Sequence, residues 1–169
     1  NKEDALKYYK MAIDKGNPYA FNNYANMLKR GEGVDPNKEE AIKYYKIAIQ
    51  NNVPRAMTNY AIMLKKGDGI PVDIEEAIKY FKMAIDKGEP NAMDMYGDML
   101  NYGDGVPVNK LEAVKYYKMA IDKGNSESMD SYASMLRTGD GIPVNKEEAV
   151  KYYKMAIDKG NSDSMYNYA

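Results

Sequence analysis

The sequence predicts an all-α fold, a solenoid built from antiparallel helix pairs. A closely similar segment recurs with a fixed period of 36 residues, marked by Ala5, Ala41, Ala77, Ala113 and Ala149. Each period holds two apolar stripes with helical spacing, and the connections between them are short. A period of this size is typical of a stacked array, in which each unit buries its apolar face against its neighbours.

The first helix of each period, the A helix, is expected over segments such as residues 18–30. Pro18, Pro54 and Pro90 suit its first position, where the backbone nitrogen needs no partner. A glycine that ends each copy is followed by an extended Gly-Val/Ile connection. Such short links favour antiparallel neighbours.

The second helix, the B helix, is expected over segments such as residues 38–50. An Asn or Asp followed three residues later by Glu, as in Asn37 and Glu40, predicts a capped first turn. A glycine such as Gly88 closes each copy in the left-handed conformation, and Asn52 replaces it once.

Comparison of the copies within the chain predicts the core. Small and aromatic residues recur in the B helices, and Met, Tyr and Leu recur in the A helices. These positions follow helical spacing, so we interpret the many methionines and tyrosines as core residues and not as a cofactor site. In the first full copies they are Ala41, Tyr44, Tyr45, Ala48, Ile49, Met57, Tyr60, Met63 and Leu64.

Composition argues against several classes of function. The chain has no cysteine and no histidine, which excludes disulfides, thiolate chemistry and structural zinc. No catalytic constellation is recognisable, so we expect no enzyme activity, no cofactor, no metal site and no small-molecule substrate. A net charge of −1 argues against nucleic-acid binding, and there is no apolar run of about 18 residues for membrane insertion. A cytoplasmic location is the expectation.

The repeats resemble the Sel1-like repeat family, which shares the helix-pair plan of tetratricopeptide repeats. The matching residues are Ala-x-x-x-Tyr-Ala-x-Met-Leu in the A helix, Gly-Asp-Gly-Ile/Val in the loop and Glu-Ala-x-Lys-Tyr-Tyr-Lys-x-Ala in the B helix. Aligned with the family's unit, one domain over 1–169 comprises a half repeat (1–16), full repeats 17–52, 53–88, 89–124 and 125–160, and a truncated repeat (161–169). The resemblance implies a right-handed superhelix with the A helices on its concave side, and a role as an adaptor or scaffold for protein complexes.

The candidate binding residues lie where the copies differ. B helices are nearly invariant, but A helices vary at steps of three and four residues, on one stripe away from the core. We expect this stripe to be exposed and to form a concave partner-binding face. Its candidate residues are Tyr19, Asn22, Asn23, Asn26, Arg30, Arg55, Asn59, Ile62, Lys66, Asp94, Met95, Asp98, Tyr102, Asp130, Ser131 and Ser134.

The stripe is basic in the first two full repeats and acidic in the next two. Such polarity would orient a partner of opposite charge order, and Asn23 and Asn59 could grip a peptide backbone because an amide both donates and accepts. A solvated face that varies without a ligand remains an open alternative. The charged residues are Lys29, Arg30, Arg55, Lys65 and Lys66, then Asp94, Asp98, Glu127 and Asp130.

Three functions follow from these observations. The first is a non-enzymatic scaffold that binds a protein or peptide on its A helices. The alternative is a structural repeat component of a larger assembly, docking through its ends or convex face, with self-association or continuation of the array possible there. RNA binding along the lysines of the B helices is a third interpretation, against which the acidic balance speaks.

Overall fold

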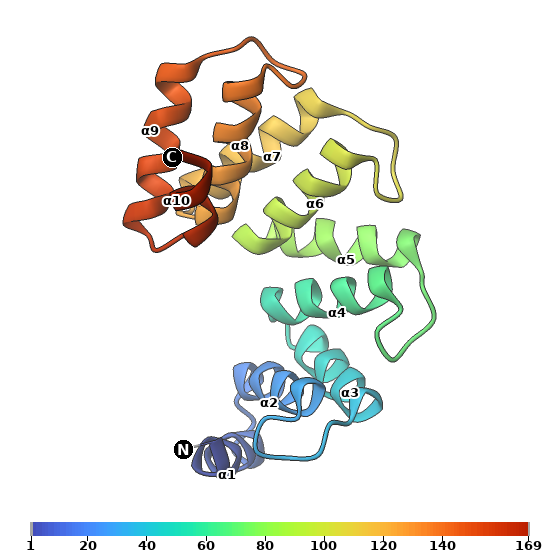
Figure 1. Cartoon of the computed structure of the whole chain (residues 1–169). Coiled ribbons are helices and arrows are strands. Elements are labelled where there is room, and N and C mark those ends of the chain that lie inside the picture. The colour runs from blue at the N-terminus through green and yellow to red at the C-terminus, as the bar shows by residue number, and fades with distance from the viewer. Residues whose placement is uncertain (1, 169) are drawn as a thin grey trace. The chain divides into compact units, whose positions relative to one another are not determined.

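The computed structural model describes residues 2–168, which form ten helices and no strand (Figure 1). Asn1 and Ala169, the ends of the predicted array, lie outside the described residues. The all-α prediction of successive helix pairs is confirmed. The helices are α1 (Lys2–Asp14), α2 (Pro18–Arg30), α3 (Lys38–Gln50), α4 (Pro54–Lys66), α5 (Ile74–Asp86), α6 (Pro90–Tyr102), α7 (Lys110–Asp122), α8 (Ser126–Thr138), α9 (Lys146–Asp158) and α10 (Ser162–Tyr168).

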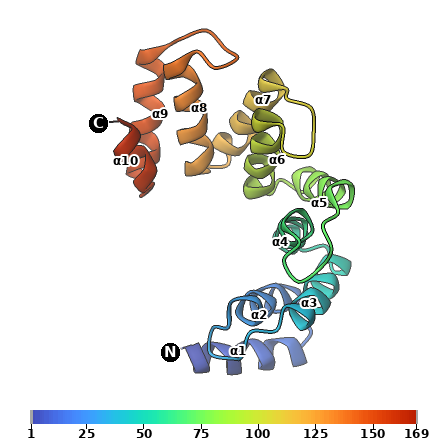
Figure 2. The same cartoon turned by 45° about the vertical axis from the view of Figure 1, so that its right-hand side comes forward.

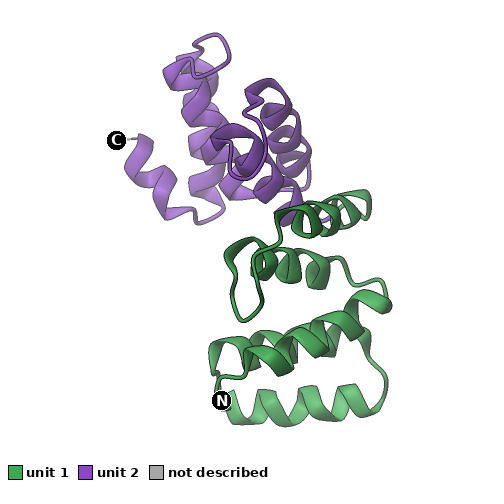
Figure 3. Ribbon diagram, turned by 90° about the vertical axis from the view of Figure 1, so that its right-hand side faces the viewer, with its two compact units in different colours: residues 1–88 green, residues 89–169 purple. Residues whose placement is uncertain are grey.

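The chain divides into two compact units, residues 1–88 and 89–169 (Figure 3). In the first unit, each of the helices α1 to α5 packs against the next one along the chain. In the second unit, α6 to α10 pack in the same sequential way, as the turned view in Figure 2 also shows. The A helices are α2, α4, α6, α8 and α10, and the B helices are α1, α3, α5, α7 and α9.

Local signals set the helix ends as predicted. The Glu40 amide donates to Asn37 Oδ1 at 2.9 Å, and the Asn37 side chain donates in turn to Glu40 Oε2 at 3.3 Å. This pairing satisfies an unpartnered N–H group of the first turn. At the other end of α3, Asn52 has a φ of 59°, the left-handed conformation predicted for the glycine that it replaces.

The core consists of the recurring apolar residues, as predicted. Tyr45, Met57, Met63 and their neighbours are almost fully buried. Tyr44 and Ile49, predicted to be buried, are half-buried, so the prediction is wrong for them. The Tyr44 ring packs edge-to-face with Tyr24, with 4.8 Å between the centroids. The same edge-to-face pair recurs in the other three full repeats: Tyr60 with Tyr80, Tyr96 with Tyr116, and Tyr132 with Tyr152.

Each Gly-Asp-Gly loop connects the A and B helices of one repeat and can contact the repeat before it. In the first unit, the Asp68 carboxylate pairs with Lys38 Nζ at 2.6 Å, at the start of the preceding B helix. A Cβ atom added at Gly69, which has a φ of 79°, would lie 2.6 Å from the Lys38 Cβ atom. Only glycine therefore allows this close approach. These contacts give the motif a structural role in joining repeats.

No helix within residues 2–168 combines the length and the apolar character needed to cross a membrane.

Candidate binding face

The 16 predicted residues occupy one side of the A helices, called here the A-helix face. Tyr19, Arg30, Arg55, Lys66 and Tyr102 are exposed, and the two tyrosines expose 64% and 73% of their surface. Two others, Asn22 and Asp94, are buried, with only 4% and 3% of their surface exposed. The remaining nine are half-buried: Asn23, Asn26, Asn59, Ile62, Met95, Asp98, Asp130, Ser131 and Ser134.

The prediction that the whole stripe is exposed is therefore wrong for Asn22 and Asp94. Thr58 and Asn101, on the same stripe of their own helices, are buried as well. For Asn22 and Asp94 the physical reason lies in their hydrogen bonds. Within each unit, polar side chains from consecutive A helices bond to one another instead of facing water. Variation between the copies thus has two sources, solvent exposure and pairing between repeats.

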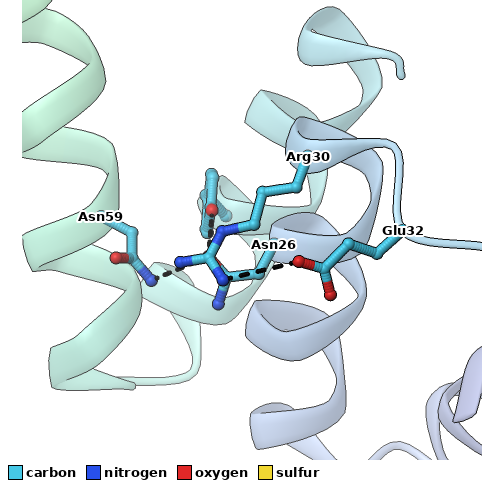
Figure 4. Close-up of polar contacts among 5 residues, drawn as sticks. Asn26, Arg30, Glu32 and Asn59 are labelled. Atoms are coloured by element: carbon cyan, nitrogen blue, oxygen red, sulfur yellow. Dashed lines mark hydrogen bonds and ion pairs between the residues drawn. The ribbon is translucent and has the colours of Figure 1, made fainter. Parts of the chain in front are cut away.

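In the first unit, amides join α2 to α4. Asn59 Nδ2 donates to Asn22 Oδ1 at 3.0 Å and to Asn26 Oδ1 at 3.3 Å, and Asn22 Nδ2 donates to Asn23 Oδ1 at 3.2 Å. Figure 4 shows Asn59 extending from α4 toward Asn26. The fully buried Tyr45 hydroxyl also donates to Asn26 Oδ1, at 2.6 Å. This amide network binds the two A helices without any formal charge.

The last turn of α2 is positively charged, since it carries Lys29 and Arg30. The Arg30 guanidinium lies 3.7 Å from the Glu32 carboxylate and is largely exposed (Figure 4). Partial burial lowers the pKa of Lys29, and the nearby Arg30 and Lys66 charges lower it further, against the opposite influence of Asp68. The cations are close enough to repel one another, so an anionic group placed among them would be favoured.

In the second unit, carboxylates occupy the corresponding positions. Asp94 Oδ1 accepts from Ser128 Oγ at 2.5 Å, which joins α6 to α8. Asp130 Oδ1 accepts from Ser164 Oγ at 2.7 Å, and Asn167 Nδ2 donates to both Asp130 oxygens at 3.1 Å, which joins α8 to α10. A carboxylate network therefore replaces the amide network of the first unit.

Burial changes the proton affinity of this network. Removal from water, together with the nearby Asp98 and Glu127 charges, raises the pKa of Asp94 from 3.8 to about 7, although the Ser128 hydrogen bond opposes the shift. Tyr117 donates to Asp98 Oδ1 at 2.7 Å, and burial together with the Asp98 charge raises the pKa of its phenol. Asp94 therefore titrates near neutral pH.

Two pockets open beside these networks. In the first unit, a pocket of about 260 Å³ includes Asn23, Asn26 and Glu32 in its wall. In the second, a pocket of about 240 Å³ is lined mainly by polar groups of α6, α8 and α10. It brings together the predicted residues Tyr102, Asp130, Ser131 and Ser134, whose side chains thus share one concavity.

Sequence reasoning missed the partners of the carboxylates. Ser128 and Ser164 stand where the other copies carry alanine, and each follows its aspartate, Asp94 or Asp130, by 34 residues. The joint appearance of the aspartate and the serine was the feature of the sequence that could have revealed these pairs. The conservative Ala-to-Ser change concealed it, because serine at a helix position is usually solvated.

Comparisons with known proteins agree with this architecture. The sequence profile of the Sel1 repeat matches residues 1–17, 18–53, 54–89, 90–125 and 126–161. A Sel1 repeat protein from Oxalobacter formigenes is 31% identical with a TM-score of 0.88, over 98% of this chain and 67% of that one. A protective antigen with this repeat fold from uropathogenic Escherichia coli is 26% identical with a TM-score of 0.83, over 99% of this chain and 36% of that one.

An immunity protein from Pseudomonas aeruginosa shares the fold at 21% identity and a TM-score of 0.73, over 94% of this chain and 59% of that one. No match was found among curated proteins. The chain thus spans about two thirds of one of these solved structures and smaller parts of the other two.

Proposed function

Because the chain belongs to the Sel1 repeat family, whose members generally serve as protein-interaction scaffolds, we propose that it is a non-enzymatic scaffold that binds a protein or peptide on the A-helix face. The binding residues are those of the face that the two polar networks leave at the surface.

The exposed members of the face carry this proposal. Tyr19, Arg30, Arg55, Lys66 and Tyr102 remain exposed after the residues that join the repeats are set aside. Tyrosine and arginine are enriched at the energetic centres of protein interfaces, because both combine a large contact surface with a polar group. Two of these residues are tyrosines exposed by 64% and 73%, so their rings are accessible to a partner.

Charge indicates the kind of partner segment that each unit favours. The exposed cations of the first unit favour an acidic segment, and the carboxylates of the second unit favour a basic one. Complementary charge speeds the encounter and suppresses wrong partners more than it adds affinity. We therefore expect a salt-dependent association rate.

The test needs a partner, obtained by capture from native extract with the intact gene product and then purified. Reversal of two cations on the A-helix face, with Arg30→Glu and Lys66→Glu, is expected to weaken direct binding by roughly tenfold or more. The matched control is Lys43→Glu with Lys79→Glu, which makes the same charge change on exposed B-helix positions of the same unit. Calorimetric titration of both variants gives the comparison.

Two results would contradict the proposal. Equal affinity of both variants and the original chain would remove the A-helix face from the interface. A loss confined to the B-helix control would favour the alternative, in which the repeats dock through another face as a component of a larger assembly.

A further inference from the structure

We propose that the pocket of the second unit is a subsite for a protonated amine, the lysine side chain of a bound peptide. The pocket has a volume of about 240 Å³, and its acceptors include Asn101, Asp130, Ser131 and Ser134. This inference rests on the proposed function, because it assigns part of the A-helix face to one chemical group of the partner.

The first observation is an unpaired acceptor in the pocket wall. Asn101 exposes only 7% of its surface, and its Oδ1 atom has no hydrogen-bond partner among the described residues. A buried carbonyl oxygen without a donor is destabilising, so a ligand that brings a donor within its reach is favoured. None of the donors in the pocket wall reaches this oxygen.

The second observation is the residue type at this position. The other full repeats carry Lys29, Lys65 and Arg137 where this one carries Asn101. The following position, basic in the first two copies, carries Tyr102 here. The repeat that contributes α6 to the pocket thus carries an acceptor where the other full repeats carry a cation, which leaves room there for a cation supplied by a partner.

The third observation is the charge of Asp130. Its hydrogen bonds come from neutral donors, Ser164 Oγ and Asn167 Nδ2, which leave the carboxylate charge in place. Asp140 also lines the pocket, but its carboxylate is already paired with Lys110. Asp130 is therefore the carboxylate that would hold the bound cation.

The acceptors favour an ammonium group over a guanidinium group. Asn167 Nδ2 contacts both oxygens of Asp130, so the carboxylate edge that guanidinium binds with two parallel hydrogen bonds is occupied. An ammonium group has three donors that can be directed to separate oxygen atoms. One Asp130 oxygen and the hydroxyl oxygens of Ser131 and Ser134, which line the pocket, offer such a set.

The test uses acetyl-Gly-Gly-Lys-Gly-Gly-amide and its norleucine counterpart, which has the same chain length without the ammonium group. Titration into the intact protein is followed by NMR, on the Asn101 side-chain amide and the backbone amides of Ser131 and Ser134. The lysine peptide is expected to give saturable shifts at these groups, and norleucine to bind roughly tenfold or more weakly. An arginine peptide is expected to fall between them.

Asn101→Lys supplies the decisive variant, because the equivalent positions carry Lys29 and Lys65 and the fold accommodates lysine there. Its ammonium group would occupy the pocket, so affinity for the lysine peptide is expected to fall roughly tenfold or more. Asp122→Asn, on the exposed end of α7, makes the same change of net charge outside the pocket and is expected to leave the affinity unchanged.

Several outcomes would overturn the assignment: equal binding of lysine and norleucine peptides, absence of saturable shifts, or unchanged affinity of Asn101→Lys. Tighter binding of spermidine than of the lysine peptide would contradict the proposal that the bound amine belongs to a peptide. Each of these results leaves the charge-reversal test of partner binding untouched, so failure of the subsite and failure of the scaffold function are distinguishable.

Discussion

The two units join their A helices in chemically different ways at equivalent repeat positions. In the first unit, Asn59 bonds to Asn22 and Asn26, and every group is neutral. In the second, Ser128 and Ser164 bond to Asp94 and Asp130, so these two links each contain a carboxylate, beside a neutral bond from Asn125 to Asn91. Burial of a neutral amide with its partners costs little, whereas burial of a carboxylate raises its proton affinity. The same repeat geometry therefore gives one network without a titratable group and one that contains a carboxylate with a raised pKa.

The largest expected effect is the removal of this pH response by Asp94→Asn. The pKa of folded Asp94 is about 7, above its ordinary value of 3.8, so between these values the folded chain holds a proton that the unfolded chain releases. Stability is therefore lost as the pH rises through this window, by roughly 4 kcal/mol at about 1.4 kcal/mol per pKa unit. The variant carries asparagine, as the equivalent position in the first full repeat does at Asn22. It is expected to lose this dependence of stability on pH. Urea denaturation at a series of pH values measures it.

The converse substitution, Asn22→Asp, tests whether the difference between the units lies in this position alone. It places a carboxylate in the buried site of the first unit and is expected to introduce a loss of stability with rising pH. Parallel pH profiles for the original chain and Asp94→Asn would show that burial of Asp94 does not control the response.

An effect of intermediate size on stability is expected at the buried tyrosines whose hydroxyls bond to the A helices. The Tyr45 hydroxyl donates to Asn26 Oδ1, and at the same positions the next repeat carries Phe81 and Ile62. Asn26→Ile alone leaves a buried hydroxyl without an acceptor, which is expected to cost about 1 to 3 kcal/mol. Addition of Tyr45→Phe reproduces the apolar pair and is expected to recover most of the loss.

A double-mutant cycle in urea denaturation measures this coupling. The same cycle on Tyr117 and Asp98 in the second unit is expected to give a larger coupling energy, since a hydrogen bond to a carboxylate is roughly twice as strong as one between neutral groups. Additive costs in both cycles would show that the exchange at Phe81 and Ile62 is unrelated to hydrogen bonding.

The sequence was sufficient for the helices, because their signals are local. Pro18 at the first turn of α2 and the Asn37–Glu40 pair at the start of α3 act within a few residues, and the predicted ranges 18–30 and 38–50 match the structure. The buried tyrosines and methionines followed from periodicity in the same way.

The face could be predicted only in part, because its contacts are not local. Whether Asn22 or Asp94 meets water depends on which residue of the neighbouring A helix lies opposite, and that register is set by packing of whole helices. The pairs Asp94–Ser128 and Asp130–Ser164 are separated by 34 residues, two fewer than the period, so alignment of the copies by equivalent position does not bring them together. The role of the Asn101 side chain likewise could not be predicted, because the pocket that it lines forms only when the helices pack together.

The smallest expected effect concerns a link that the two units share. Lys38 pairs with Asp68 in the first unit and Lys110 with Asp140 in the second, in each case between a B helix and the following Gly-Asp-Gly loop. Both pairs are partly exposed, so Lys38→Met and Lys110→Met are each expected to cost about 0 to 1 kcal/mol, and less at high salt. Urea denaturation at low and high ionic strength measures both. Because neither pair is deeply buried, the two costs are expected to be equal. A markedly larger cost for Lys110→Met would mean that Asp140 also senses the negative charge of the second unit, which would extend the difference between the units from the A helices to the loops.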